Sequence, residues 1–347
     1  MNRRSIASTV CVTVAGIVAV VFSVAVSGQS TVPARRTAPA AKTYTAPRTP
    51  DGQPDLQGFW TNSTYTPLER PDGVTKEYYT PGEAAAAAKK AAADEATQTT
   101  PGTVADVHYD FTQFGLDKSQ SALAPNLRTS LIVNPENGKL PPLTDEGKRR
   151  AAEHAEMAKK VGRWDSAQSN ELDDRCIIMA GAGPPMLNAT YNANYQIVQA
   201  PGYVMILVEM IHDVRIIPLD GRPQPPPAVR QWLGTSRGRW EGDTLVVSTT
   251  NFNGKNPLHG SSENMTVTER FTRVSDTAIR YQFTVEDSST WVRAWSAEMP
   301  MKKTVGPLFE HACHEGNYGL YNTLVGARLE EKKKAAEAAA RGEKPAK

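Results

Sequence analysis

Three residues beside apolar segments have side chains suited to general acid or base catalysis: Glu209, His212 and Glu315. Glu209 directly follows the apolar run Tyr203–Val208, where a carboxylate needs an ion pair or hydrogen bonds. Arg215 is a candidate partner. A three-residue connection would place Glu209 and Arg215 opposite one another, whereas a two-residue turn would put them on different faces. Glu209 is therefore either a catalytic acid or base, or a structural carboxylate.

The six histidines of the chain form no HExxH or other compact metal motif. Four of them, His212, His259, His311 and His314, follow or precede strand-like segments, and loops at one end of a sheet bring distant residues together. They would then form either a transition-metal site or a set of unrelated histidines. We assign no metal ligand from the sequence, and the cofactor remains unknown.

Aromatic residues supply the expected wall of a binding cavity. Most large aromatic side chains belong in a core, but some can line an apolar cavity that accepts a small organic ligand or a sugar ring. We therefore predict a ligand-binding set made of these aromatic residues and two polar ones: Trp60, Arg215, Trp240, His259, Tyr281 and Trp295.

Two features could supply a nucleophile. Cys176 and Cys313 remain after the leader described below, and in an exported chain such a pair predicts a disulfide. The alternative is a reactive Cys313 beside His314, although adjacent residues on a strand point to opposite faces. The segment Gly234–Gly238 matches the GxSxG pattern of serine hydrolases, but the residues after it predict a strand rather than the required helix. We interpret that segment as a glycine-bounded loop.

The elements that would position these residues are strands. Between Tyr195 and Pro300 short segments of alternating apolar and polar residues are separated by polar turns, as in Arg237–Phe252 and Ala278–Glu286. The run Tyr203–Met210 is apolar on both faces and predicts a strand buried on both. The fold class is therefore mainly β, an antiparallel meander closed into a barrel or sandwich, lipocalin-like, with a few peripheral helices. Thr144 is expected to cap one of these helices, over Asp145–Val161.

The ends of the chain predict export. Residues 1–28 have the features of a signal peptide: a basic n-region, an apolar stretch and small residues at the expected cleavage site. The alternative is an uncleaved membrane anchor. The leader is followed by a Pro/Ala/Thr-rich linker (29–50), a single β-rich domain (51–327) with a helical insertion at about 76–165, and a charged Ala-rich tail (328–347).

Losing the two leader arginines reduces the formal net charge from +2 to 0. A neutral chain argues against nucleic-acid binding, and without its leader it would have no stable membrane insertion.

Several segments resemble a large uncharacterised family of secreted bacterial proteins. They include Pro54–Trp60 (PDLQGFW), Gly238–Val247 (GRWEGDTLVV), Glu269–Val274 (ERFTRV) and His311–Gly319 (HACHEGNYG), within a resemblance that runs from about Asp51 to Arg328. The resemblance implies secretion but no activity or catalytic residue. Gly58-Phe59-Trp60 also matches the G-x-W at the first strand of lipocalins, which implies a lipocalin-like barrel.

These observations predict a periplasmic or secreted β-barrel that binds a small, partly apolar organic molecule. The alternative is a hydrolase or lyase with acid–base or metal chemistry in the same cavity. A third possibility is an envelope interaction module, for which the Ala/Lys/Glu segments would be docking helices. The sequence leaves open whether the protein is an enzyme and what its oligomeric state is.

Overall fold

The computed structural model describes residues 44–96, 126–162, 164–179, 181–188 and 192–342. The predicted leader lies outside the described residues, as do the linker up to residue 43 and the last five residues of the predicted tail. Among the described helices none is long and apolar enough to cross a membrane.

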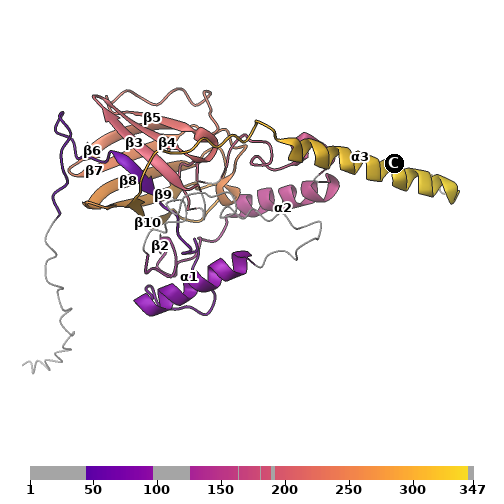
Figure 1. Cartoon of the computed structure of the whole chain (residues 1–347), viewed down its shortest axis with the longest axis horizontal. Helices are drawn as coiled ribbons and strands as arrows, with labels where there is room; N and C mark the ends of the chain where they lie inside the picture. The colour runs from indigo at the N-terminus through magenta and orange to yellow at the C-terminus, as the bar shows by residue number, and fades with distance from the viewer. Residues whose placement is uncertain (1–43, 97–125, 163, 180, 189–191, 343–347) are drawn as a thin grey trace, which may run out of the picture. The chain divides into compact units, whose positions relative to one another are not determined.

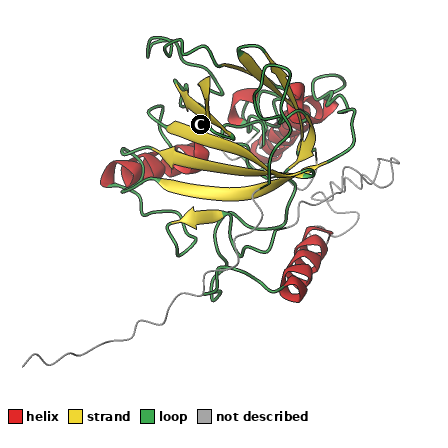
Figure 2. Cartoon of the chain, turned by 90° about the vertical axis from the view of Figure 1, so that its left-hand side faces the viewer, coloured by secondary structure: helices red, strands yellow, loops and turns green. Residues whose placement is uncertain are grey.

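The fold is a large antiparallel sheet that curves until it is nearly closed into a barrel (Figures 1 and 2). The strand order is β5-β4-β3-β1-β10-β9-β8-β7-β6, and β2 pairs separately with β10. The prediction of a mainly β, antiparallel fold is confirmed. The strands are β1 (Gly58–Thr61), β2 (Ile132–Asn134), β3 (Asn194–Ala200), β4 (Tyr203–Val208), β5 (Val214–Pro218), β6 (Thr235–Glu241), β7 (Thr244–Thr250), β8 (Thr266–Ser275), β9 (Ala278–Glu286) and β10 (Trp295–Lys303).

Helices in the described part of the chain are α1 (Pro81–Ala96), α2 (Asp145–Lys160) and α3 (Tyr318–Ala340), with short 3-10 turns at Ala167–Ser169, Met210–His212 and Leu258–Gly260. The Thr144 hydroxyl accepts a hydrogen bond from the Gly147 N–H at 3.0 Å, which confirms the predicted cap of α2. Helix α3 begins at Tyr318, before the expected start of the tail at Arg328.

The barrel interior is filled by inward-facing side chains of the long strands. On β8, β9 and β10 every second residue is buried, as the alternation predicts. Phe271, Tyr281, Phe283 and Trp295 form a continuous chain of aromatic contacts with ring centroids 4.9–5.7 Å apart. This part of the barrel is therefore a packed core.

Strand β4 differs from its prediction. Its inward residues Val204, Ile206 and Val208 are buried, but the outward-facing Tyr203 is exposed and Met205 and Leu207 are only partly covered. The expectation that this apolar run is buried on both faces is wrong, because nothing in the described part of the chain packs fully over its outer face.

Candidate functional site

A segment between α2 and β3, which we call the plug (residues 172–179 and 181–187), is hydrogen-bonded to side chains of the barrel. The Met186 N–H donates to the Tyr281 hydroxyl at 2.8 Å, and the Met186 carbonyl accepts from Asn62 at 2.9 Å. The Tyr195 hydroxyl donates to the Gly181 carbonyl at 3.0 Å. These bonds fix the plug near the end of the barrel where β3 and β8 begin.

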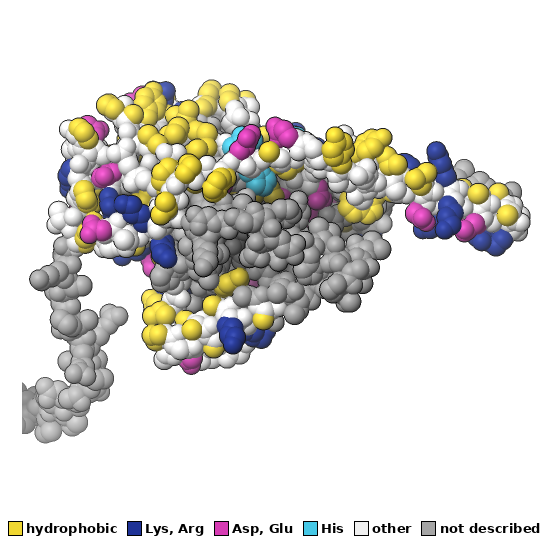
Figure 3. All heavy atoms as spheres, viewed as in Figure 1, with side chains coloured by type: hydrophobic (Ala, Val, Ile, Leu, Met, Phe, Trp, Pro, Cys, Tyr) yellow, Lys and Arg dark blue, Asp and Glu magenta, His cyan; other side chains and the backbone are white. Residues whose placement is uncertain are grey.

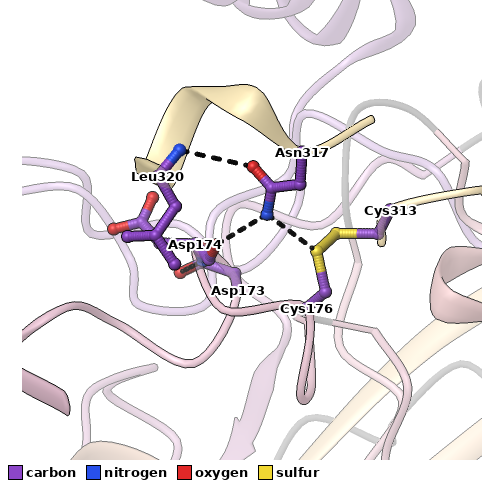
Figure 4. Close-up of a disulfide and its surroundings, with 6 residues drawn as sticks. All are labelled: Asp173, Asp174, Cys176, Cys313, Asn317 and Leu320. Carbon is purple, nitrogen blue, oxygen red and sulfur yellow. Dashed lines mark hydrogen bonds between the residues drawn. A yellow bond between two sulfur atoms is a disulfide. The ribbon is translucent and has the colours of Figure 1, made fainter. Parts of the chain in front are cut away.

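A disulfide between Cys176 and Cys313 joins the plug to the chain just before α3 (Figure 4). Their Cα atoms are 5.7 Å apart, and the predicted pairing is confirmed. The Asn317 side chain caps α3 by accepting from the Leu320 N–H, and its amide donates to the Asp174 carbonyl and to the Cys176 sulfur. Cys313 is bonded and is therefore not the free nucleophile of the alternative interpretation.

A cavity of about 550 Å³ lies against the plug. Its walls come from the plug, from the loops around Trp232 and Leu258, and from α2 through His154. Apolar side chains outnumber polar ones in the lining: Leu172, Ile178, Met179, Leu187, Trp232, Leu233, Phe252, Leu258 and Met265. The polar side chains among the lining residues are those of His154, Glu171, Asp173, Lys255, Asn256 and His259.

His259 is the sequence-predicted site residue that lies on this cavity. Partial burial lowers the pKa of His259, and the nearby Glu69 carboxylate acts in the opposite direction. An imidazole with a lowered pKa is neutral near pH 7, so it can accept or donate a hydrogen bond to a ligand. Among the described residues no group of three His, Cys, Asp or Glu side chains is arranged to hold a metal ion.

Glu209 is buried on the outer side of the sheet, at the end of β4. It accepts hydrogen bonds from the Asn194 side chain at 2.6 Å and from the Phe309 N–H at 3.2 Å. The register that pairs Ile206 with Arg215 continues to Glu209 and His212, so the connection is a two-residue turn. Glu209 and Arg215 therefore lie on different faces, as the two-residue alternative requires.

Arg215 points into the barrel and pairs with Glu269, a residue that the sequence analysis did not select. The two side chains are 4% and 0% exposed. The Tyr281 hydroxyl donates to the same carboxylate at 2.8 Å, and Ser236 lies 3.4 Å from the guanidinium. Ser236 of the GxSxG match is thus part of strand β6 in the barrel wall, and the interpretation of that segment as a loop is wrong.

The remaining predicted site residues lie elsewhere. His212 and Glu315 have exposed side chains. Trp60, Tyr281 and Trp295 are fully buried in the barrel core, and Trp240, half-buried on β6, is not among the residues that line the cavity. Their assignment as catalytic or ligand-binding residues remains a prediction.

Sequence reasoning missed most of the cavity because its walls come from irregular segments. The plug carries the glycine- and proline-rich stretch Gly181–Pro185, and Trp232 follows the proline-rich loop after β5. Such segments have no hydrophobic periodicity from which their neighbours can be inferred. One signal in the sequence could have located the plug. Cys176, through its predicted disulfide with Cys313, places the plug beside the segment before α3.

No family model, curated protein or solved structure matches the chain. The proposed function therefore rests on the geometry of the cavity.

Proposed function

We propose that the protein binds a small, partly apolar organic molecule in the cavity between the plug and the barrel-end loops. The observation that carries this proposal is the size and lining of the cavity. Its volume of about 550 Å³ lies inside the range of roughly 300–1,000 Å³ that small-molecule sites occupy. Small-molecule sites combine apolar walls with a few polar groups, and this lining has the same composition.

The polar groups restrict the ligand further. Lys255 and the imidazoles of His154 and His259 offer hydrogen-bond donors, while Glu171 and Asp173 offer acceptors. A ligand with an apolar body and one or two polar substituents would satisfy both kinds of surface. Trp232 supplies a flat apolar wall on which a ring of the ligand can stack.

Export belongs to the same proposal. A disulfide between segments far apart in the chain is typical of an oxidising compartment, and it supports a periplasmic or secreted location. Membership of the family of secreted bacterial proteins that the sequence resembles is proposed on the same ground.

A hydrolase or lyase is the second candidate, because two imidazoles and two carboxylates line one cavity. An imidazole with a lowered pKa can act as a general base near neutral pH, and His259 has that property.

The test of binding uses 8-anilinonaphthalene-1-sulfonate, a small apolar anion whose fluorescence rises on binding. We expect saturable binding to the wild type and at least a tenfold weaker affinity in Leu258→Trp, where the larger ring fills the cavity, a loss of about 1.4 kcal/mol. Val292→Trp, at an exposed position that does not line the cavity, is the matched control and should bind as the wild type does. Equal affinity in wild type and Leu258→Trp would overturn the proposed site.

A second measurement separates binding from catalysis. If the protein is an enzyme, wild type should turn over at least one member of a panel of aryl esters and glycosides, and His259→Gln should lose that turnover while keeping its affinity for the dye. A binding protein should show no turnover in any variant.

A further inference from the structure

The outer face of the β4–β5 hairpin differs chemically from the outer face of β8, β9 and β10. On β8, β9 and β10 the outward positions are mainly polar or charged: Thr268, Arg270, Thr272, Arg280, Gln282, Thr284, Ser296, Glu298 and Lys302. On the β4–β5 hairpin every outward cross-strand pair is apolar or aromatic: Tyr203 with Pro218, Met205 with Ile216, and Leu207 with Val214. The outer face of the β4–β5 hairpin thus has the composition of an interface core.

This face is exposed in the described part of the chain. Exposed fractions are 38% for Tyr203, 48% for Val214 and 62% for Ile216. Phe309, 51% exposed, joins the same face, because its N–H is bonded to Glu209, the next outward residue after Leu207. Figure 3 shows hydrophobic side chains gathered over the region where Figure 1 labels β3, β4 and β5. We call Tyr203, Met205, Leu207, Val214, Ile216 and Phe309 the apolar face.

The borders of the apolar face are polar. At one end Arg222 stacks on the Tyr203 ring, donates to its hydroxyl at 2.8 Å, and forms an ion pair with Asp220. At the other end lie the exposed His212 and the half-buried Asp213. An apolar centre with a polar border is the usual anatomy of a protein–protein interface.

We propose that the apolar face is the contact between two copies of this chain in a two-fold dimer. An interface of this symmetry must be complementary to itself. The centre of the apolar face meets that condition because it has no charged residue, so two copies can appose their centres without a like-charge contact there.

The exposed area of the apolar face is in the range of known interaction sites. The four half-exposed side chains present on the order of 400 Å² of apolar surface, within the size range of the largest patch on a monomer that often marks an interaction site. Two copies would bury about 800 Å² of it, so the polar border would have to add at least about 400 Å² to reach the roughly 1,200 Å² of the smaller specific stable interfaces.

The test measures the molar mass in solution of the chain without its predicted leader, by sedimentation equilibrium over a wide concentration range. We expect a dimer for the wild type and a dissociation constant more than about 100-fold higher for Ile216→Lys, because the two-fold axis buries the new charge twice. Val292→Lys, 59% exposed and away from this face, should dimerise as the wild type does. Unchanged thermal unfolding of the monomers checks that each variant keeps its fold.

Three outcomes would overturn the proposal. One is a wild-type chain that stays monomeric at every concentration, including a monomer that binds neutral lipid vesicles through this face. Another is a dimer that Ile216→Lys and Val214→Lys leave intact. The third is a dimer that dissociates in Tyr321→Lys or Leu329→Lys alone, which would place the contact on the exposed apolar residues of α3.

Discussion

Replacing Glu269 with alanine should destabilise this barrel more than most substitutions, because it leaves a cation buried without its counter-ion. The Arg215 guanidinium donates to both oxygens of Glu269, and the side chains are 4% and 0% exposed. After the substitution, the hydroxyl of Ser236 at 3.4 Å is the side-chain acceptor left to Arg215 in the described part of the chain. Tyr281 also loses the acceptor for its own hydroxyl.

The magnitude follows from the burial of the pair. Removing one partner of a buried ion pair costs about 3–5 kcal/mol of unfolding free energy. A domain of ordinary stability has roughly 5–15 kcal/mol, so Glu269→Ala should remove a large share of it. Replacing both partners, as in Arg215→Met with Glu269→Leu, removes the uncompensated charge. This double variant should therefore recover most of the loss.

Urea unfolding followed by tryptophan fluorescence measures the difference. Glu269→Gln, which keeps the side-chain volume, separates loss of charge from loss of packing. Glu241, which pairs with Arg239 and Arg270 on the exposed side of the sheet, is the matched control, and Glu241→Ala should cost less than about 1 kcal/mol. The reasoning is refuted if Glu269→Ala costs no more than Glu241→Ala, or if the double variant is as unstable as Glu269→Ala.

Three further predictions concern stability. Burial raises the pKa of Tyr195 and of Tyr281, and Glu269 adds to the effect on Tyr281. The stability from these neutral phenols is present below the unfolded-state pKa of about 10 and is lost as the pH rises above it. Absorbance near 295 nm should therefore show both phenols ionising only with alkaline unfolding, and ionisation in the folded barrel would contradict this. Breaking the disulfide, which closes a loop with a sequence separation of 137, should cost up to about 5 kcal/mol in thermal or urea unfolding. An unchanged melting temperature after reduction would show that the plug is fixed by its hydrogen bonds alone. Gly147→Ala should destabilise α2 despite the better helix propensity of alanine, because its Cβ would lie 2.6 Å from the Thr290 carbonyl oxygen, whereas Gly326→Ala in α3 meets no atom within 4 Å and should stabilise by up to about 1 kcal/mol. If Gly147→Ala and Gly326→Ala changed the unfolding free energy in the same direction, that would argue against the steric conflict.

The strands were predictable because their signal is local. Alternating residues such as those of Ala278–Glu286 have one face toward the core whichever strand lies beside them. The cap at Thr144 is also local, since its partner is three residues away. The disulfide could be predicted from the number of cysteines together with the predicted leader.

The partner of Arg215 was not predictable in the same way. Glu209 follows the apolar strand β4, and Glu269 lies at an inward position of the alternating strand β8. The choice between them depends on the length of the β4–β5 turn and on the curvature that brings β8 across the barrel. A change of one residue in that turn would exchange the two faces of the strand. The sequence is compatible with both turn lengths and contains no local signal that selects one.

The sequence by itself determined the strand class, the cap and the cysteine pairing, because each follows from neighbours along the chain or from composition. The tertiary structure alone decided that the plug lies near one end of the barrel, that the cavity gathers His259 with Trp232 and Leu258, and that the outer face of β4–β5 is left uncovered in the described chain. Those features depend on contacts between segments far apart in sequence. Such contacts are fixed by barrel closure and register, which are properties of the whole sheet and of no single strand.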